Sequence, residues 1–102
     1  MVGESDDVEV ESLDWDRENV THIARHGVSR ENVEFALSHA PRFFRNLPGR
    51  SATHIMIGRD EEGRVLYVPL IQLDRPGATW RVVSAWESRF ARRLYPGEEQ
   101  AR

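Results

Sequence analysis

Hydrophobic residues recur with a helical period in the first half of the chain. An i, i+3, i+4, i+7 pattern predicts a helix over residues 30–39 with one buried face. The apolar positions of this pattern are Val33, Ala36, Leu37 and Ala40. A second apolar face predicts a helix over residues 16–26, and Asp16 can cap its first turn. Two consecutive helices are therefore expected before Pro41, which cannot continue a helix.

The stretch HIARHGVS, which begins at His22, joins the two predicted helices. Gly27 can adopt the positive φ that ends a helix, and Ser29 can cap the next helix. His22 and His26 lie one helical turn apart, as two metal ligands would. The zinc-protease pattern needs glutamate after the first histidine, but this chain has Ile23, and no third ligand is obvious nearby. We interpret the stretch as a helix corner and expect no metal site.

Beyond Pro41 the pattern changes to the alternation typical of β-strands. Four strands separated by turns with glycine or proline are predicted over residues 42–46, 54–59, 64–73 and 79–86. Pro69 predicts a bulge or an edge location in the third of these strands. A short helix is predicted over residues 87–95. The resulting fold class is α+β, with two N-terminal helices, an antiparallel sheet of about four strands and a short C-terminal helix.

Length and composition indicate one small domain, because 102 residues with 39% hydrophobic content suit a single core. Residues 1–12 are acidic and are expected to be a flexible tail, residues 13–95 the folded domain, and residues 96–102 a second flexible tail. Cysteine is absent, which excludes disulfides and thiolate chemistry. No apolar run is long enough to span a bilayer, and no signal peptide is recognisable, so we expect a cytoplasmic protein without membrane contact.

Charge is distributed unevenly along the chain. Residues 1–40 carry ten acidic residues against three arginines, a net charge of −7. Residues 41–102 carry eleven arginines against seven acidic residues, a net charge of +4. Arginine is well suited to bind phosphate, although a genome rich in arginine codons would give the same bias without a function. An arginine-rich sheet face with aromatic neighbours could bind RNA through its backbone and stack on its bases.

Several short motifs resemble the BrnT-like toxin family, whose members have a RelE-like fold. The resemblance covers about residues 13–95 and is carried by Trp15-Asp16, Asn19, Arg25-His26-Gly27-Val28-Ser29, Ile57-Gly58-Arg59, Gly63-Arg64, Arg81-Val82-Val83-Ser84-Ala85 and Arg93-Leu94-Tyr95. It implies the toxin component of a bacterial type II toxin–antitoxin system. Such a toxin is a metal-independent endoribonuclease that uses the ribose 2′-OH as nucleophile and needs no cofactor. The implied partner is a small antitoxin with a ribbon-helix-helix DNA-binding domain.

The resemblance and the residue chemistry together predict a site on the sheet. Arg81 would hold the phosphate, His54 would act as general acid or base, and Tyr95 would assist. The residues expected to bind RNA are Arg45, Arg59, Arg89, Arg92 and Arg93. For His54 alone, a partly exposed polar residue on the open face of the sheet is the alternative.

Departures from the family pattern leave a second function open. The family usually has Glu-Arg where this chain has Ala52-Thr53, and a basic pair where it has Trp86-Glu87. The glutamate that usually precedes the arginines of the terminal helix has no clear counterpart. The alternative is therefore a catalytically inactive, toxin-like interaction module that binds a protein or nucleic acid partner.

Overall fold

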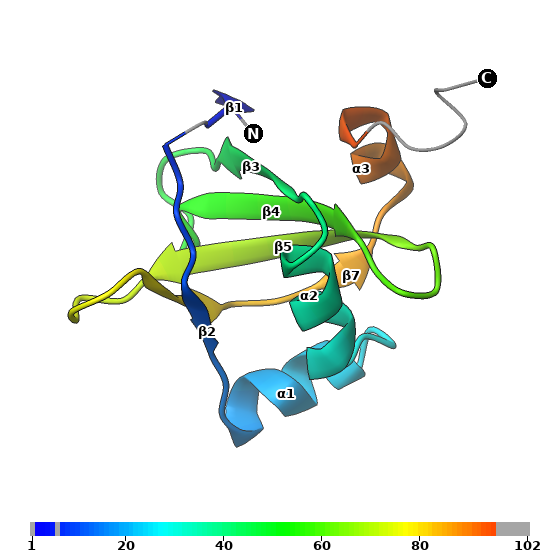
Figure 1. The fold of residues 1–102 in the computed structure, drawn as a ribbon, viewed down its shortest axis with the longest axis horizontal. Coiled ribbons are helices and arrows are strands. Elements are labelled where there is room, and N and C mark those ends of the chain that lie inside the picture. Colours follow the sequence, from blue (N-terminus) through cyan, green and yellow to red (C-terminus); the bar gives the residue numbers. More distant parts are fainter. Residues whose placement is uncertain (1, 6, 96–102) are drawn as a thin grey trace.

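The protein is described by a computed structural model that covers residues 2–5 and 7–95 (Figure 1). Within these residues, seven strands and three helices follow one another in an order that begins with two strands. In chain order these are β1 (Val2–Glu4), β2 (Ser12–Asp14), α1 (Arg17–Ala24), α2 (Arg30–Leu37), β3 (Arg42–Arg45), β4 (His54–Arg59), β5 (Val65–Gln72), β6 (Thr79–Val82), β7 (Trp86–Glu87) and α3 (Arg89–Leu94). No helix within the described residues is long and apolar enough to cross a membrane.

The sheet differs from the predicted one. Its strands lie in the order β1-β3-β4-β5-β6-β2, and β7 pairs with β5 beside this path. The sheet is mixed, because β2 runs parallel to β6 while the other pairs are antiparallel. The fold is α+β, but the predicted arrangement, in which two N-terminal helices precede an antiparallel sheet of about four strands, is wrong.

Strand β1, which the prediction missed, comes from the acidic N-terminal segment, and β2 lies close to the short edge strand expected around residues 13–15. Residues 1–12, expected to be a flexible tail, supply β1 and the first residue of β2. Val8 and Val10 pack against the core, and the carbonyl of Glu9 accepts a hydrogen bond of 2.8 Å from Trp80 Nε1. The alternation of apolar and acidic residues from Val8 to Glu11 lies between the two strands and forms no strand itself. The predicted C-terminal tail, residues 96–102, lies outside the described residues.

The predicted helix corner is present, and both helices begin with reciprocal caps. Asp16 accepts from the backbone of Asn19 at 3.0 Å, and the Asn19 amide oxygen accepts from the backbone of Asp16 at 2.9 Å. Ser29 and Asn32 repeat this arrangement at the start of α2. Gly27 has a φ of 74°, which ends the turn after α1 at low steric cost. Both helices end before the predicted limits, at Ala24 and Leu37.

The strand predicted over residues 79–86 forms two strands, β6 and β7, which pair with β5 on either side of Pro69. Leu66 and Tyr67 pair with β7, whereas Leu70–Gln72 pair with β6. Pro69 has no backbone N–H, so it cannot donate to the ladder at this point. Its carbonyl accepts a hydrogen bond of 2.9 Å from the backbone of Val83, which lies in the segment between β6 and β7. The proline therefore marks a change of partner strand rather than the predicted bulge or edge.

Hydrophobic residues fill both faces of the sheet. On one face, buried residues of α1 and α2 such as Ile23 and Val33 pack against Met56 and Val68. On the opposite face, Ala91 of α3 belongs to a second cluster with strand residues. The strand members of that cluster are Phe44, Ile55, Ile57 and Val65. Figure 1 shows α1 and α2 next to each other, with α3 separated from them.

We predict that Gly58→Ala destabilises the contact between α2 and β4. A Cβ atom at Gly58 would lie 3.1 Å from Ala36 Cβ and 3.2 Å from the Ala36 carbonyl oxygen. The added methyl group forces neighbouring atoms of the packed core apart, which is expected to reduce the free energy of unfolding by about 1–3 kcal/mol. Urea denaturation measures this loss. Gly3→Ala is the control, because a Cβ atom there meets nothing within 4 Å. Equal stability of the two variants would contradict the prediction.

Candidate nucleic-acid interface

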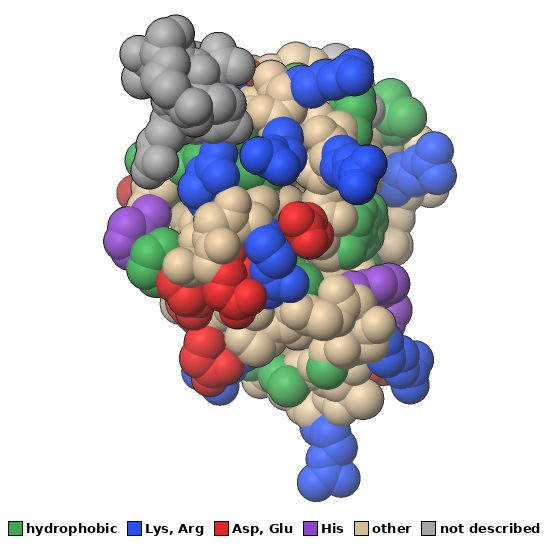
Figure 2. All heavy atoms as spheres, turned by 90° about the vertical axis from the view of Figure 1, so that its right-hand side faces the viewer, with side chains coloured by type: hydrophobic (Ala, Val, Ile, Leu, Met, Phe, Trp, Pro, Cys, Tyr) green, Lys and Arg blue, Asp and Glu red, His purple; other side chains and the backbone are tan. Residues whose placement is uncertain are grey.

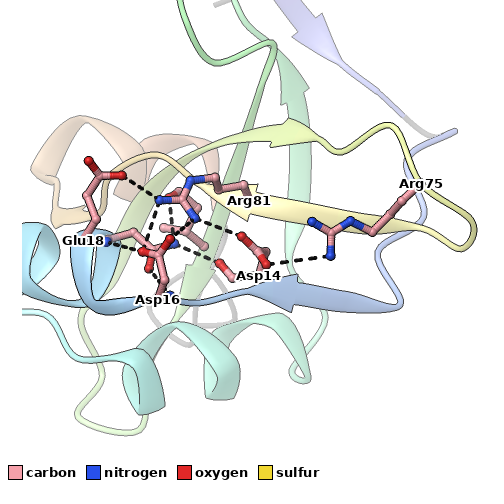
Figure 3. Close-up of polar contacts among 7 residues, drawn as sticks. Asp14, Asp16, Glu18, Arg75 and Arg81 are labelled. Carbon is pink, nitrogen blue, oxygen red and sulfur yellow. Dashed lines mark hydrogen bonds and ion pairs between the residues drawn. The ribbon is translucent and has the colours of Figure 1, made fainter.

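Arg81, the predicted phosphate ligand, is held by three carboxylates (Figure 3). The parallel pairing of β6 with β2 places Arg81 opposite Asp14, and its guanidinium donates to Asp14 Oδ2 at 2.9 Å. It also donates to Asp16 Oδ2 at 2.9 Å and to Glu18 Oε1 at 3.0 Å. Hydrogen bonding to Asp16 is the main cause that raises the pKa of Arg81, and the same bond lowers the pKa of Asp16. Arg81 therefore clamps β6, β2 and α1 together.

The Arg81 clamp makes stability depend on pH in the acidic range. Because the pKa of Asp16 is lowered in the folded state, its stabilising effect is present at neutral pH and lost as the pH falls through that folded pKa. Asp16→Asn should therefore show a smaller fall in Tm than the wild type between about pH 6 and pH 3. Asparagine is also a good N-cap residue, so the cap of α1 is kept. The same loss of Tm in both proteins would contradict this prediction.

His54, the predicted acid or base, lies on β4 opposite Arg45 of β3. Its ring meets Trp80 edge-on with centroids 5.0 Å apart, and its Nδ1 is 2.9 Å from the Thr53 hydroxyl. Burial, and then the positive charge of Arg45, lower the pKa of His54 below its ordinary value of 6.5. The imidazole is therefore neutral at pH 7 and can accept a proton.

Strand register places His54 and Arg81 on opposite faces of the sheet. His54 is opposite Leu70, and Leu70 is opposite Val82. Residues directly opposite each other on neighbouring strands point to the same face, while adjacent residues on one strand alternate. Arg81, which precedes Val82, is therefore on the other face. The two side chains cannot hold one phosphate between them.

Tyr95, the third predicted catalytic residue, holds the end of α3 in place. Its hydroxyl donates to the carbonyls of His39 at 3.0 Å and Ala40 at 3.2 Å, in the turn between α2 and β3. The Arg59 guanidinium lies 5.9 Å from the centre of the Tyr95 ring. The structure therefore does not bring Arg81, His54 and Tyr95 together around one point.

The predicted RNA-binding arginines occupy separate places. Arg59 donates from the end of β4 to the carbonyl of Gly63 at 2.7 Å. Three others are exposed on α3, namely Arg89, Arg92 and Arg93. Figure 2 shows the molecule from the side on which α3 lies in Figure 1, and arginine side chains gather over the upper part of this view. Arg45 is apart from these, on β3 beside His54.

A hollow of about 340 Å³ unites two predicted site residues, His54 and Arg45. Thr53 and the turn of residues 46–49 contribute further walls. Arg50 also lines this hollow and was not among the predicted site residues. The signal available in the sequence was its position directly after the Leu-Pro-Gly turn, in the loop that leads into β4. One neutral imidazole and two guanidinium groups are a set that suits a phosphodiester. We call this the His54 hollow.

The histidines of the helix corner take part in side-chain contacts. His22 Nε2 lies 3.1 Å from the Ser84 hydroxyl, and the rings of His22 and His26 meet edge-on at 5.6 Å. His26 also approaches Trp86, with ring centroids 6.1 Å apart. No group of three histidine or acidic residues within the described part of the chain is placed to hold a metal ion.

No protein-family model, curated protein or solved structure matches this chain. The resemblance to BrnT-like toxins consequently depends on the short motifs alone.

Proposed function

We propose that this chain is the toxin component of a type II toxin–antitoxin system and cleaves RNA at the His54 hollow without a metal ion. The observation that supports this proposal is the register of β3 and β4, which sets Arg45 beside a histidine whose pKa is lowered. Arg50 lines the same hollow. Arg81 is not the phosphate ligand in this proposal, because three carboxylates occupy its guanidinium.

Four side chains of the hollow have a role in the proposed transesterification, namely Arg45, Arg50, Thr53 and His54. Thr53 is within hydrogen-bonding distance of His54 Nδ1, which leaves Nε2 to accept the proton of the ribose 2′-OH. The 2′ oxygen attacks phosphorus, the bond to the 5′ oxygen breaks, and the leaving oxygen takes a proton from water. The protonated His54 then gives its proton to the hydroxide that remains, which restores the neutral imidazole. Arg45 and Arg50 stabilise the charge that develops on the phosphoryl oxygens. The products are a 2′,3′-cyclic phosphate and a 5′-hydroxyl end.

The experiment that tests this proposal is cleavage of single-stranded RNA in the presence of a chelator. Arg45→Ala should lower cleavage at least about tenfold, because it removes a charge-assisted hydrogen bond to phosphate. Arg17→Ala is the matched control, since it removes an exposed arginine from α1, outside the hollow. Absence of cleavage by the wild type, or an equal effect of both substitutions, would contradict the proposal.

Neutralisation of Arg81 favours a second candidate function, an interaction module without catalysis. In that case the chain binds a ribbon-helix-helix antitoxin or RNA but leaves RNA intact. The buried Ala52 and its neighbour Thr53, which replace the usual Glu-Arg of the family, agree with such a loss. Expression in bacteria separates the two functions, because only the ribonuclease should arrest growth and lose this effect in the Arg45→Ala variant.

A further inference from the structure

A second hollow, of about 260 Å³, adjoins the other side of the turn that borders the His54 hollow. Its wall is the aromatic pair of Tyr67 on β5 and Trp86 on β7, which are opposite each other in the sheet. Their rings stack with centroids 4.9 Å apart and an angle of 26°. Pro69 and Ile55 extend this wall. We call this the Trp86 hollow.

The polar groups of the Trp86 hollow are available to a ligand. Burial raises the pKa of Tyr67, so its hydroxyl is protonated at neutral pH, and the nearby charge of Arg50 acts in the opposite direction. Within the described residues this hydroxyl donates no hydrogen bond, and Arg50 forms no ion pair. The hollow therefore combines a flat aromatic wall, an uncommitted hydroxyl and an uncommitted cation.

We propose that the Trp86 hollow binds a nucleobase, with the attached phosphate held by Arg50. Aromatic side chains provide the flat apolar surface on which a base stacks, and a guanidinium suits the phosphate of the same nucleotide. Arg50 lies at the turn between the two hollows and lines both of them, whereas Ile55 and Tyr67 point to the sheet face opposite to His54. The role of the Trp86 hollow in RNA binding rests on the proposed function, but binding of a nucleotide there requires no cleavage.

Titration with adenosine 5′-monophosphate and with adenosine, followed by amide NMR shifts, tests this site. Trp86→Leu is expected to weaken binding of both about tenfold, and Trp86→Phe, which keeps an aromatic ring, should retain most of it. Arg50→Ala should weaken binding of the monophosphate and leave adenosine unchanged. This difference between the two ligands tests the site even if Trp86→Leu does not fold.

A short oligoadenylate, titrated in parallel, identifies the source of the nucleotide. Binding of both adenosine 5′-monophosphate and the oligoadenylate supports a site that accepts free nucleotides. Binding of the oligoadenylate alone supports a subsite for RNA, provided that Trp86→Phe weakens this binding less than Trp86→Leu does. His54→Ala should keep nucleotide binding even where cleavage is lost, so failure of the ribonuclease proposal is distinguishable from failure of this one. Affinities unchanged by both Trp86→Leu and Arg50→Ala, or no binding of either probe, would overturn the inference.

Discussion

Replacement of His54 by alanine is expected to lower RNA cleavage by about a hundredfold or more, because a positioned general base contributes 10²–10⁴-fold. The imidazole lies in a hollow with Arg45 and Arg50, and in the proposed mechanism it accepts the proton of a ribose hydroxyl next to the phosphate. Binding of RNA should change little, since the arginines remain. His39→Ala is the matched control, because His39 is exposed at the end of α2. A similar loss in both variants, or none in either, would contradict the assignment.

The pH profile of cleavage provides a further check on His54. A general base works in its neutral form, so cleavage should decline as the pH falls through the pKa of His54. Burial and Arg45 lower that pKa, which places the decline below pH 6.5. Arg45→Ala removes the positive charge and should move the decline to higher pH. A profile that stays in place would show that another group titrates.

The second large effect is expected from Arg64→Ala, which should reduce the free energy of unfolding by about 3 kcal/mol. The Asp60 side chain is fully buried and accepts hydrogen bonds from the Arg64 backbone and from Arg64 Nε, both at 2.9 Å. Arg64 also donates to the carbonyl of Gly27 at 3.0 Å and to Asn32 Oδ1 at 3.1 Å. Its removal would leave a buried carboxylate without its cation and would remove the hydrogen bonds from Arg64 to Gly27 and Asn32 of the helix corner.

Arg75→Ala is the control for this prediction, because Arg75 is exposed and its guanidinium is as far as 3.9 Å from Asp14 Oδ1. Such a surface pair contributes less than about 1 kcal/mol. Urea denaturation of the wild type and both variants measures the difference. If Arg64→Ala costs no more than Arg75→Ala, the Asp60 network does not hold the corner to the hairpin.

The Arg64 network brings two distant motifs into contact. The helix corner contains Gly27, and the Gly63-Arg64 motif follows the loop after β4. In the folded chain the guanidinium of Arg64 contacts the Gly27 carbonyl directly. The sequence suggested that HIARHGVS turns the chain rather than binds metal. The structure adds that the Arg64 guanidinium links the Gly27 carbonyl of this turn to the β4–β5 hairpin.

Local features were predictable from the sequence because neighbouring residues determine them. The caps at Asp16 and Ser29, and the positive φ of Gly27, depend on residues within one turn of helix. Strand β4 was predicted with its observed limits, because alternation within six residues indicates a strand. His54 and Arg45 could both be identified as candidates for RNA chemistry from their residue type. Their position opposite each other could not.

Non-local contacts decided the rest of the molecule. The acidic first half and the basic second half were visible as net charges, but the sequence did not indicate which residues would meet. Arg81 binds carboxylates that precede it by more than 60 residues, and only the parallel pairing of β2 with β6 brings them together. A shift of one residue in strand register reverses the face to which every side chain points. For this reason Arg81 is a clamp and His54 lies in the candidate site, a distinction that residue type alone does not make.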